Sequence, residues 1–231
     1  MNRRTLLALP LFLTLAACTR DEHWNQRLTL VVATPAGDIT GSVVQRVDWQ
    51  GATGFYQSAT AGLDPSQTST RVTGEALALE ITPGHWVFAL LKGDNGWQGE
   101  PGLNAGFVIA VPNGHHARSA EGVDDILAYP RDTPVVLPPE AWPMLVTFDD
   151  ITKPETVRRV DPADMAAVFG PGVALKAVTL EVTEAAVTEG RVEGVLGWLC
   201  AIKASRVRLN GKSGPVFDNE LSNRIGSGEF K

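Results

Sequence analysis

The feature that most restricts the fold of this chain is a set of apolar runs too short to form helices. WVFALLK at 86–92, FVIAV at 107–111 and MLVTF at 144–148 each lie next to glycine or proline. Apolar runs of this length indicate buried strands. RLTLVVAT and ITGSVVQRVDW, separated by the turn-forming cluster PAGD, predict a β-hairpin. The sequence therefore predicts a mainly β fold, an antiparallel β-sandwich or a barrel-like domain with one or two short helices.

The clearest helix signal lies in DPADMAAVFGPG. Asp161 is suited to the N-cap, Pro162 to the first turn, and Gly170 and Pro171 to the end of the helix. Met165, Val168 and Phe169 are spaced to cover one face. GVDDILA predicts a second, shorter helical turn, whereas the glycine-rich stretch GDNGWQGEPGLNAG predicts an exposed loop.

The first eighteen residues have the organisation of an export signal. Arg3 and Arg4 precede an apolar core of about a dozen residues, shorter than the ~20 that span a bilayer. The core leads into Leu15-Ala16-Ala17-Cys18, which resembles the lipobox of bacterial lipoproteins. The resemblance implies cleavage after residue 17 and acylation of Cys18, which would hold the mature chain on a membrane. An ordinary secretory signal with a chance cysteine is the alternative.

The same segment predicts an address and a domain organisation. The twin arginines loosely match a twin-arginine signal, so general secretion and twin-arginine export both stay open. The residue after the cysteine is Thr19. By the sorting rule of the lipoprotein class, an aspartate at this position would keep the protein in the inner membrane, so Thr19 favours the outer membrane. We expect a signal peptide at 1–17, the lipidated Cys18 and a polar tether at 18–26, and a single β-rich periplasmic domain at 27–231.

The charge and the cysteines restrict partners further. Twenty Lys and Arg against 26 Asp and Glu give a formal net charge of −6 without a basic block, so nucleic acid is not an expected partner. With Cys18 assigned to the lipid, Cys200 has no partner for a disulfide. Cys200 lies in the apolar run VLGWLCAI, which predicts a buried and unreactive thiol.

One group of residues is a candidate for metal binding. His115 and His116 are adjacent, with Asp124 and Asp125 nearby, but neighbouring side chains of an extended chain point to opposite sides. The spacings H-x₃-H and H-E-x-x-H are absent from the sequence. The histidines therefore predict a solvated loop, and we expect neither a bound metal nor a cofactor.

A carboxylate group at the end of the third apolar run is the candidate for catalysis. Asp149, Asp150 and Glu155 could serve glycoside hydrolysis, which needs two carboxyl groups ~5 to 9.5 Å apart. Adjacent aspartates followed by Thr152 and Pro154 are, however, typical of a turn. The sequence thus predicts no catalytic residue, and whether the chain is an enzyme stays open, with a non-enzymatic role favoured.

Trp97 is the candidate binding residue, because it lies in the glycine-rich loop where nothing in the local pattern requires burial. An exposed indole can stack on a sugar or contact a protein partner. The alternative is that Trp97 folds back onto the sheet.

A second resemblance concerns the body of the chain. GEALALEI, WVFALLKG and ETVRRVDPADMAAVFGPGVAL are similar to segments of uncharacterised envelope lipoproteins, a group that implies no activity. We therefore expect a membrane-anchored envelope lipoprotein that offers a binding or assembly surface to an envelope protein or polymer. A hydrolase acting on envelope polymers is the alternative.

Overall fold

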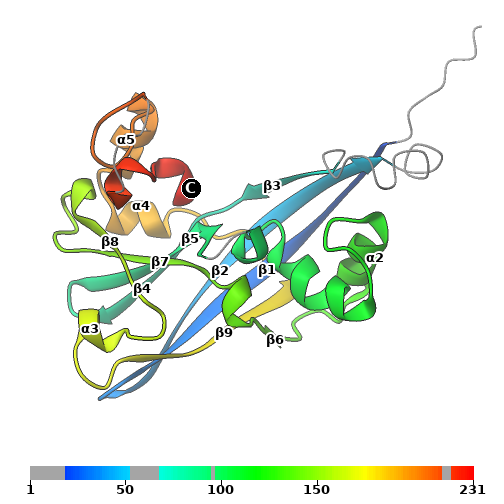
Figure 1. Cartoon of the computed structure of the whole chain (residues 1–231), viewed down its shortest axis with the longest axis horizontal. Coiled ribbons are helices and arrows are strands. Elements are labelled where there is room, and N and C mark those ends of the chain that lie inside the picture. The colour runs from blue at the N-terminus through cyan, green and yellow to red at the C-terminus, as the bar shows by residue number, and fades with distance from the viewer. Residues whose placement is uncertain (1–18, 53–67, 95–96, 215–219) are drawn as a thin grey trace, which may run out of the picture.

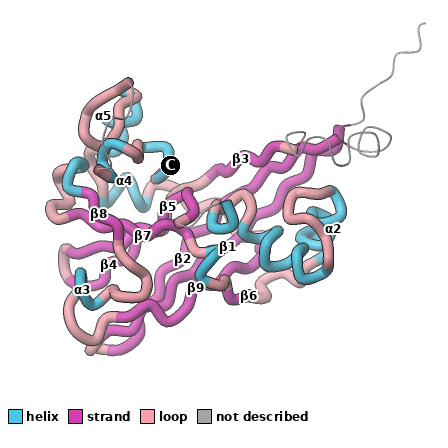
Figure 2. The backbone as a smooth tube through the Cα atoms, viewed as in Figure 1, coloured by secondary structure: helices cyan, strands magenta, loops and turns pink. Residues whose placement is uncertain are grey.

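Two open antiparallel sheets form the centre of the molecule (Figures 1 and 2). The structure is a computed structural model that describes residues 19–52, 68–94, 97–214 and 220–231. Sheet A has the order β3-β2-β1-β9-β6 and sheet B the order β4-β5-β7-β8. Neither sheet closes on itself among the described residues, so the mainly β prediction is confirmed in its sandwich form.

The strands differ widely in length. Sheet A consists of β3 (Ser69–Thr73), β2 (Gly37–Ala52), β1 (Thr19–Thr34), β9 (Ala174–Thr183) and β6 (Val135–Val136). Sheet B consists of β4 (Leu77–Thr82), β5 (His85–Gly93), β7 (Pro143–Phe148) and β8 (Val157–Arg159).

The helices are short. The α-helices are α2 (Ala120–Ala128), α3 (Ala166–Phe169), α4 (Arg191–Val195) and α5 (Leu199–Ser205). A π-helical turn covers Gly106–Ala110, and 3₁₀ turns cover Trp97–Gly99, Val111–Asn113, Pro139–Ala141, Pro154–Thr156, Leu221–Asn223 and Ser227–Glu229.

The predicted hairpin is confirmed and is longer than expected. β1 and β2 pair along their whole length, from Thr19 opposite Ala52 to Thr34 opposite Gly37. The Thr34 hydroxyl donates to the carbonyl oxygen of Gly37 across the turn, over 2.7 Å. Gly37 has a φ of 121°, in the region that favours glycine, so this turn depends on the glycine of PAGD.

The prediction of a tether before residue 27 is wrong from Thr19 onward, because residues 19–26 form the first half of β1. Their polar composition is compatible with a strand, since one face of an antiparallel strand can be solvated. The opposite face is buried, with Trp24 at 4 % exposure and Gln26 fully covered.

One hydrophobic core lies between the two sheets. Sheet A contributes Leu28, Leu30 and Val43 to it, and sheet B contributes Val87 and Leu145. Alternate residues of a strand point to opposite faces, so the neighbours of these residues in sheet B must be covered from the other side.

A second core covers that other side of sheet B. Phe88 and Phe148 of sheet B pack edge to face, with ring centroids 5.6 Å apart, and both contact Phe230 near the C-terminus. Val192 of α4 and Leu199 of α5 complete this core, which lies at the upper left of Figure 1. The C-terminal helices thus form a third layer, and the whole of β7 is buried.

The run FVIAV at 107–111 is not the buried strand that we predicted. It forms the π-helical turn and the turn after it, with Ile109 and Ala110 buried and Val111 43 % exposed. A short apolar run fits a buried strand and a half-buried helix equally well, so its length could not decide.

The glycine-rich stretch 93–106 is not the exposed loop that we predicted, because residues 101–106 are buried. Leu103 and Ala105 are buried, and the glycines allow close packing. A Cβ atom at Gly99 would overlap the carbonyl oxygen of Trp142, and one at Gly106 would overlap the carbonyl oxygen of Ala117. Here glycine marks contact between backbones.

The helix predicted from Asp161 starts later than expected. α3 begins at Ala166. The N–H of Ala167, in its first turn, donates to Asp164 Oδ1 over 3.2 Å. Asp161 instead accepts from the N–H of Ala163 in a preceding turn. The predicted packing face is confirmed, because Met165 is buried in the core between the sheets.

Candidate functional site

Two residues singled out in the sequence cannot be placed fully. Cys18 lies outside the described residues. The backbone of Trp97 begins a 3₁₀ turn, but its side chain also lies outside the described part of the structure. Acylation of Cys18 and binding by Trp97 therefore stay predictions.

The histidine group is not gathered into one site. His115 Nδ1 lies 2.7 Å from Asp125 Oδ2, whereas His116 Nδ1 accepts from the N–H of Arg118. Asp124 faces Arg20 instead, and the hydrogen bond from that guanidinium lowers the pKa of the Asp124 carboxyl. No group of three metal-binding side chains occurs among the described residues.

The carboxylates after β7 form the turn that the sequence favoured. The pKa of Asp150 is lowered to about 2, because the Thr152 hydroxyl and then the Lys153 ammonium donate to its carboxylate. Asp149 pairs with Arg158 over 2.7 Å. Glu155 is exposed. These contacts give the group a structural role.

The prediction of a buried Cys200 is wrong. The thiol is exposed on α5 and lies 3.7 Å from Glu193 Oε1. Its neighbour Leu199 is buried, since α5 turns successive side chains to different sides. A uniformly apolar run does not reveal which face of a short helix meets the solvent.

The site with the best-placed chemistry lies at one end of sheet B. β5 ends there, β7 begins there and β8 ends there, because neighbouring antiparallel strands run in opposite directions. An open hollow of about 560 Å³ lies at this end, within the size range of small-molecule sites. We call it the Asp94 hollow; it is lined by Asp94, Pro139, Trp142, Arg159, Asp161, Pro162 and Ala163.

Asp94 is the most unusual residue of the hollow. Its side chain is only 5 % exposed, and Oδ2 lies 2.5 Å from Arg159 Nη2. Oδ1 is buried and has no hydrogen-bond partner among the described residues. An unmet buried acceptor costs about 1–3 kcal/mol, and more when it is charged. Asp94 therefore retains an unused capacity to accept a hydrogen bond.

Only one other buried side-chain atom in the described residues shares this property, Oε1 of Gln45. Gln45 lies on β2, and its amide nitrogen donates to the carbonyl oxygen of Glu75. Gln45 does not line the Asp94 hollow, so only the oxygen of Asp94 combines burial, a missing partner and a neighbouring cavity.

Hydrogen bonds position the residues in the wall of the hollow. Trp142 donates through Nε1 to the carbonyl oxygen of Leu137 over 2.8 Å, which fixes the orientation of its indole ring. The carbonyl oxygen of Trp142 accepts from the N–H of Asp94. On the opposite side, Asp161 accepts from the N–H of Ala163 over 2.9 Å, which shapes the turn that follows β8.

The sequence contained a weak signal for this site. Asp94 follows the apolar run at 86–92 after a single glycine, and Arg159 precedes another buried position, Val160. Charged residues at the ends of buried strands are candidates for a site, but many strand ends carry a charge. The order β5-β7-β8, which brings these ends together, cannot be derived from the spacing of residues along the chain.

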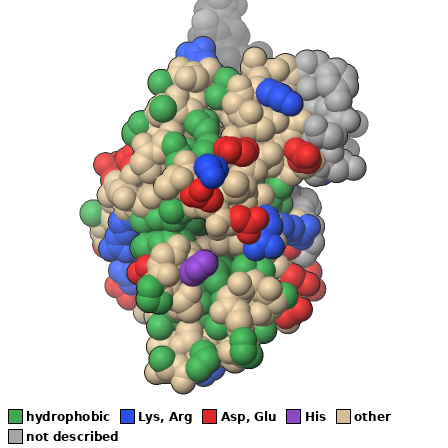
Figure 3. Space-filling model, turned by 90° about the vertical axis from the view of Figure 1, so that its left-hand side faces the viewer, with side chains coloured by type: hydrophobic (Ala, Val, Ile, Leu, Met, Phe, Trp, Pro, Cys, Tyr) green, Lys and Arg blue, Asp and Glu red, His purple; other side chains and the backbone are tan. Residues whose placement is uncertain are grey.

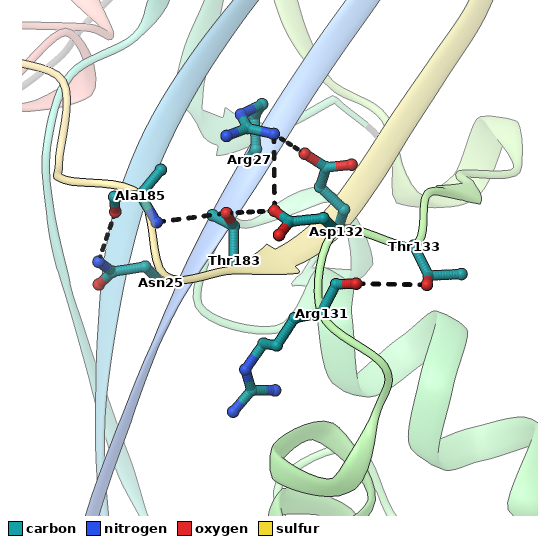
Figure 4. A network of polar contacts seen from close by, with 8 residues as sticks. Asn25, Arg27, Arg131, Asp132, Thr133, Thr183 and Ala185 are labelled. Atoms are coloured by element: carbon teal, nitrogen blue, oxygen red, sulfur yellow. Dashed lines mark hydrogen bonds and ion pairs between the residues drawn. The ribbon is translucent and has the colours of Figure 1, made fainter.

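A second polar region lies where β1 and β9 meet the loop after α2 (Figure 4). The Thr183 hydroxyl donates to Asp132 Oδ1 over 2.6 Å and accepts from the N–H of Ala185. Asn25 donates to the carbonyl oxygen of Ala185, and Arg27 pairs with Asp132. These polar groups hold the loop against sheet A.

A hollow of about 380 Å³ adjoins this network and is lined by His23, Trp24, Asn25, Arg46, Arg131, Val182, Thr183 and Glu184. Its two arginines already have acidic partners, Arg46 with Asp48 and Arg131 with Glu184. The polar network therefore has a structural role. Among the described residues, no side chain that lines this second hollow has a buried polar atom without a hydrogen-bond partner, which favours the Asp94 hollow as the candidate functional site.

Surface charge and comparisons add little to the assignment. Acidic and basic side chains lie next to one another on the face drawn in Figure 3, with hydrophobic side chains between them.

Among the described residues, no helix has the length and apolar character that crossing a membrane requires. Comparison of the chain with protein-family models, with curated proteins and with solved structures found no match.

Proposed function

We propose that the chain is an envelope lipoprotein that binds a ligand in the Asp94 hollow. Acyl chains on Cys18 would hold it at the periplasmic face of a membrane, with the outer membrane favoured. The lipobox-like sequence Leu15-Ala16-Ala17-Cys18 supports the anchor. The observation that carries the binding function is the buried Asp94, whose Oδ1 has no partner among the described residues beside an open hollow.

The anchor is tested by labelling growing cells with an alkyne-bearing fatty acid. The wild-type chain should take up the label and sediment with membranes, whereas Cys18→Ala should do neither. Cys200→Ala is the matched control, since it removes the other cysteine of the chain and should leave labelling unchanged. Equal label in the wild type and in Cys18→Ala would disprove the anchor.

The binding site is tested with a photoreactive amino acid at Ala163, an exposed residue of the hollow. Its side chain carries a small aliphatic diazirine, which leaves room for a ligand in the hollow. Illumination of living cells should join envelope material to this position. Ala201 on α5 is also exposed but is remote from the hollow, and the same amino acid there should capture nothing. Equal capture at both positions, or at neither, would argue against a specific site at the hollow.

A hydrolase acting on envelope polymers is the second candidate, because two carboxylates, Asp94 and Asp161, line the same hollow. Both already have partners: Arg159 occupies Oδ2 of Asp94, and the N–H of Ala163 occupies Oδ1 of Asp161. This arrangement favours binding over catalysis. Chain-length analysis of captured polymer after prolonged incubation separates the two, since hydrolysis would shorten it and binding would not.

A further inference from the structure

We propose that the ligand of the Asp94 hollow is a neutral sugar unit of an envelope polysaccharide. The proposal rests on the proposed function, because it takes the hollow to be a binding site. It adds the chemical class of the ligand, which follows from three properties of the lining: an apolar wall, a buried acceptor and a paired donor.

The apolar wall requires a flat, hydrophobic face on the ligand. Trp142 offers its ring and not its N–H, because Nε1 already donates to Leu137. Pro139, Pro162 and Ala163 add further apolar surface around the indole. A pyranose ring has such a face, made of its C–H groups, and binding sites combine apolar walls with a few placed polar groups.

The buried oxygen of Asp94 requires a ligand that donates hydrogen bonds. Asp94 Oδ1 is buried without a partner among the described residues, and a carboxylate can only accept. A hydrogen-bond donor supplied by a ligand in the hollow would complete the hydrogen bonds of Asp94. Phosphate and carboxylate groups are poor candidates, since they accept and would face the charges of Asp94 and Asp161.

The N–H groups of Arg159 require a ligand that also accepts hydrogen bonds. A guanidinium carries five N–H donors, and the ion pair of Arg159 with Asp94 runs through Nη2, over 2.5 Å. Arg159 is 49 % exposed, so its remaining donors can reach a ligand. A hydroxyl group both donates and accepts, and a sugar presents several hydroxyls around an apolar ring face. This combination matches the hollow better than a purely apolar, cationic or anionic group.

The test is isothermal titration calorimetry of the mature, lipidated chain in detergent micelles with defined probes. Saturation-transfer NMR follows for the probes that carry C–H protons. The probes are tetra-N-acetylchitotetraose and maltotetraose as neutral sugars, trialanine as a peptide, and inorganic phosphate. We expect a neutral sugar to bind and its ring C–H protons to receive most of the transferred magnetisation.

Variants locate the binding. Asp94→Asn should weaken sugar binding at least tenfold, whereas Asp149→Asn, which changes an exposed carboxylate at the other end of sheet B, should not change it. Ala163→Phe fills the hollow from an exposed position and removes no buried group, so it should block binding even if Asp94→Asn folds poorly. Sugar binding that survives Ala163→Phe would overturn the site.

The outcomes separate the ligand class from the proposed function. Binding of trialanine or phosphate, together with capture at Ala163 in cells and no sugar binding, would overturn the sugar and leave the binding function standing. Absence of binding by every probe, together with no capture at Ala163, would overturn both.

Discussion

Two consecutive arginines of β8 form two ion pairs that differ in one respect. Arg158 pairs with Asp149 over 2.7 Å, and Arg159 pairs with Asp94 over 2.5 Å. The arginine side chains are equally exposed, at 52 % and 49 %, but the carboxylates are not: Asp149 is 57 % exposed and Asp94 is 5 % exposed. Alternation along β8 sends the two arginines to opposite sides, one toward solvent and one toward the hollow.

The comparison teaches that burial of the acidic partner decides what an ion pair is worth. An exposed pair contributes about 0–1 kcal/mol, because water solvates both ions almost as well. Removing one partner of a buried pair costs about 3–5 kcal/mol, since the remaining charge is left without a partner and with little water. Distance alone would have rated the two pairs nearly equal.

The largest expected effect is that of Arg159→Met, which keeps the length of the side chain and removes the charge. We expect the free energy of unfolding to fall by about 3 kcal/mol, at the lower end of the range for buried pairs because Arg159 is itself half exposed. Arg158→Met should cost less than about 1 kcal/mol. Urea denaturation of the two variants measures the difference, and equal losses would break the comparison.

Removing a hydrogen bond to an exposed carboxylate should lower the free energy of unfolding by an amount between these two values. Thr183→Val removes the hydroxyl that donates to Asp132, whose side chain is 62 % exposed, and that accepts from Ala185. We expect a loss of about 1 kcal/mol in the free energy of unfolding. Thr179→Val is the control on the same face of β9, since Thr179 makes no side-chain hydrogen bond among the described residues. A larger loss for Thr179→Val would contradict the account of the network.

The two aspartates before α3 test whether an exposed carboxylate contributes more to the free energy of unfolding at a helix start than in a turn. Asp164→Ala should cost about 1 kcal/mol, because its carboxylate accepts from the N–H of Ala167 in the first turn of α3. Asp161→Ala should cost about half as much on the same scale, because Asp161 accepts only within the preceding turn. Thermal unfolding of both variants ranks them, and the reverse order would return the helix start to Asp161.

The smallest effect is expected at Cys200, because its side chain is exposed. Cys200→Ser should change the free energy of unfolding by less than about 0.5 kcal/mol, since an exposed side chain loses few contacts. The native thiol should react with a maleimide as readily as that of the unfolded chain. Protection in the native protein would show that α5 is turned differently from its position in the structure.

Prediction from the sequence succeeded where the signal was local. The hairpin β1–β2 could be predicted because its turn residues and both strands are contiguous, and β5 and β7 could be predicted from their apolar runs. The packing face of Met165 followed from helical spacing. Each of these features lies within one continuous stretch of the sequence, as strand and turn signals generally do.

The rest could not be predicted, because it depends on contacts between distant segments. The Asp94 hollow joins residues 94, 139–142 and 159–163, and only the strand order of sheet B brings them together. The burial of Leu103 and the exposure of Cys200 depend likewise on what packs against each segment. For the same reason, the difference between Asp94 and Asp149 is invisible in the sequence, where both follow an apolar run.

The start of β1 has a mechanical consequence. β1 begins at Thr19, one residue after Cys18, and pairs with β2 from its first residue to its last. On the proposed anchor, a pull on the domain away from the membrane enters along the axis of β1. Hydrogen bonds between antiparallel strands lie across that axis, so the bonds to β2 and β9 would be sheared together and not opened one by one. The central strand of sheet A would then act as the tension-bearing element between the lipid and the domain.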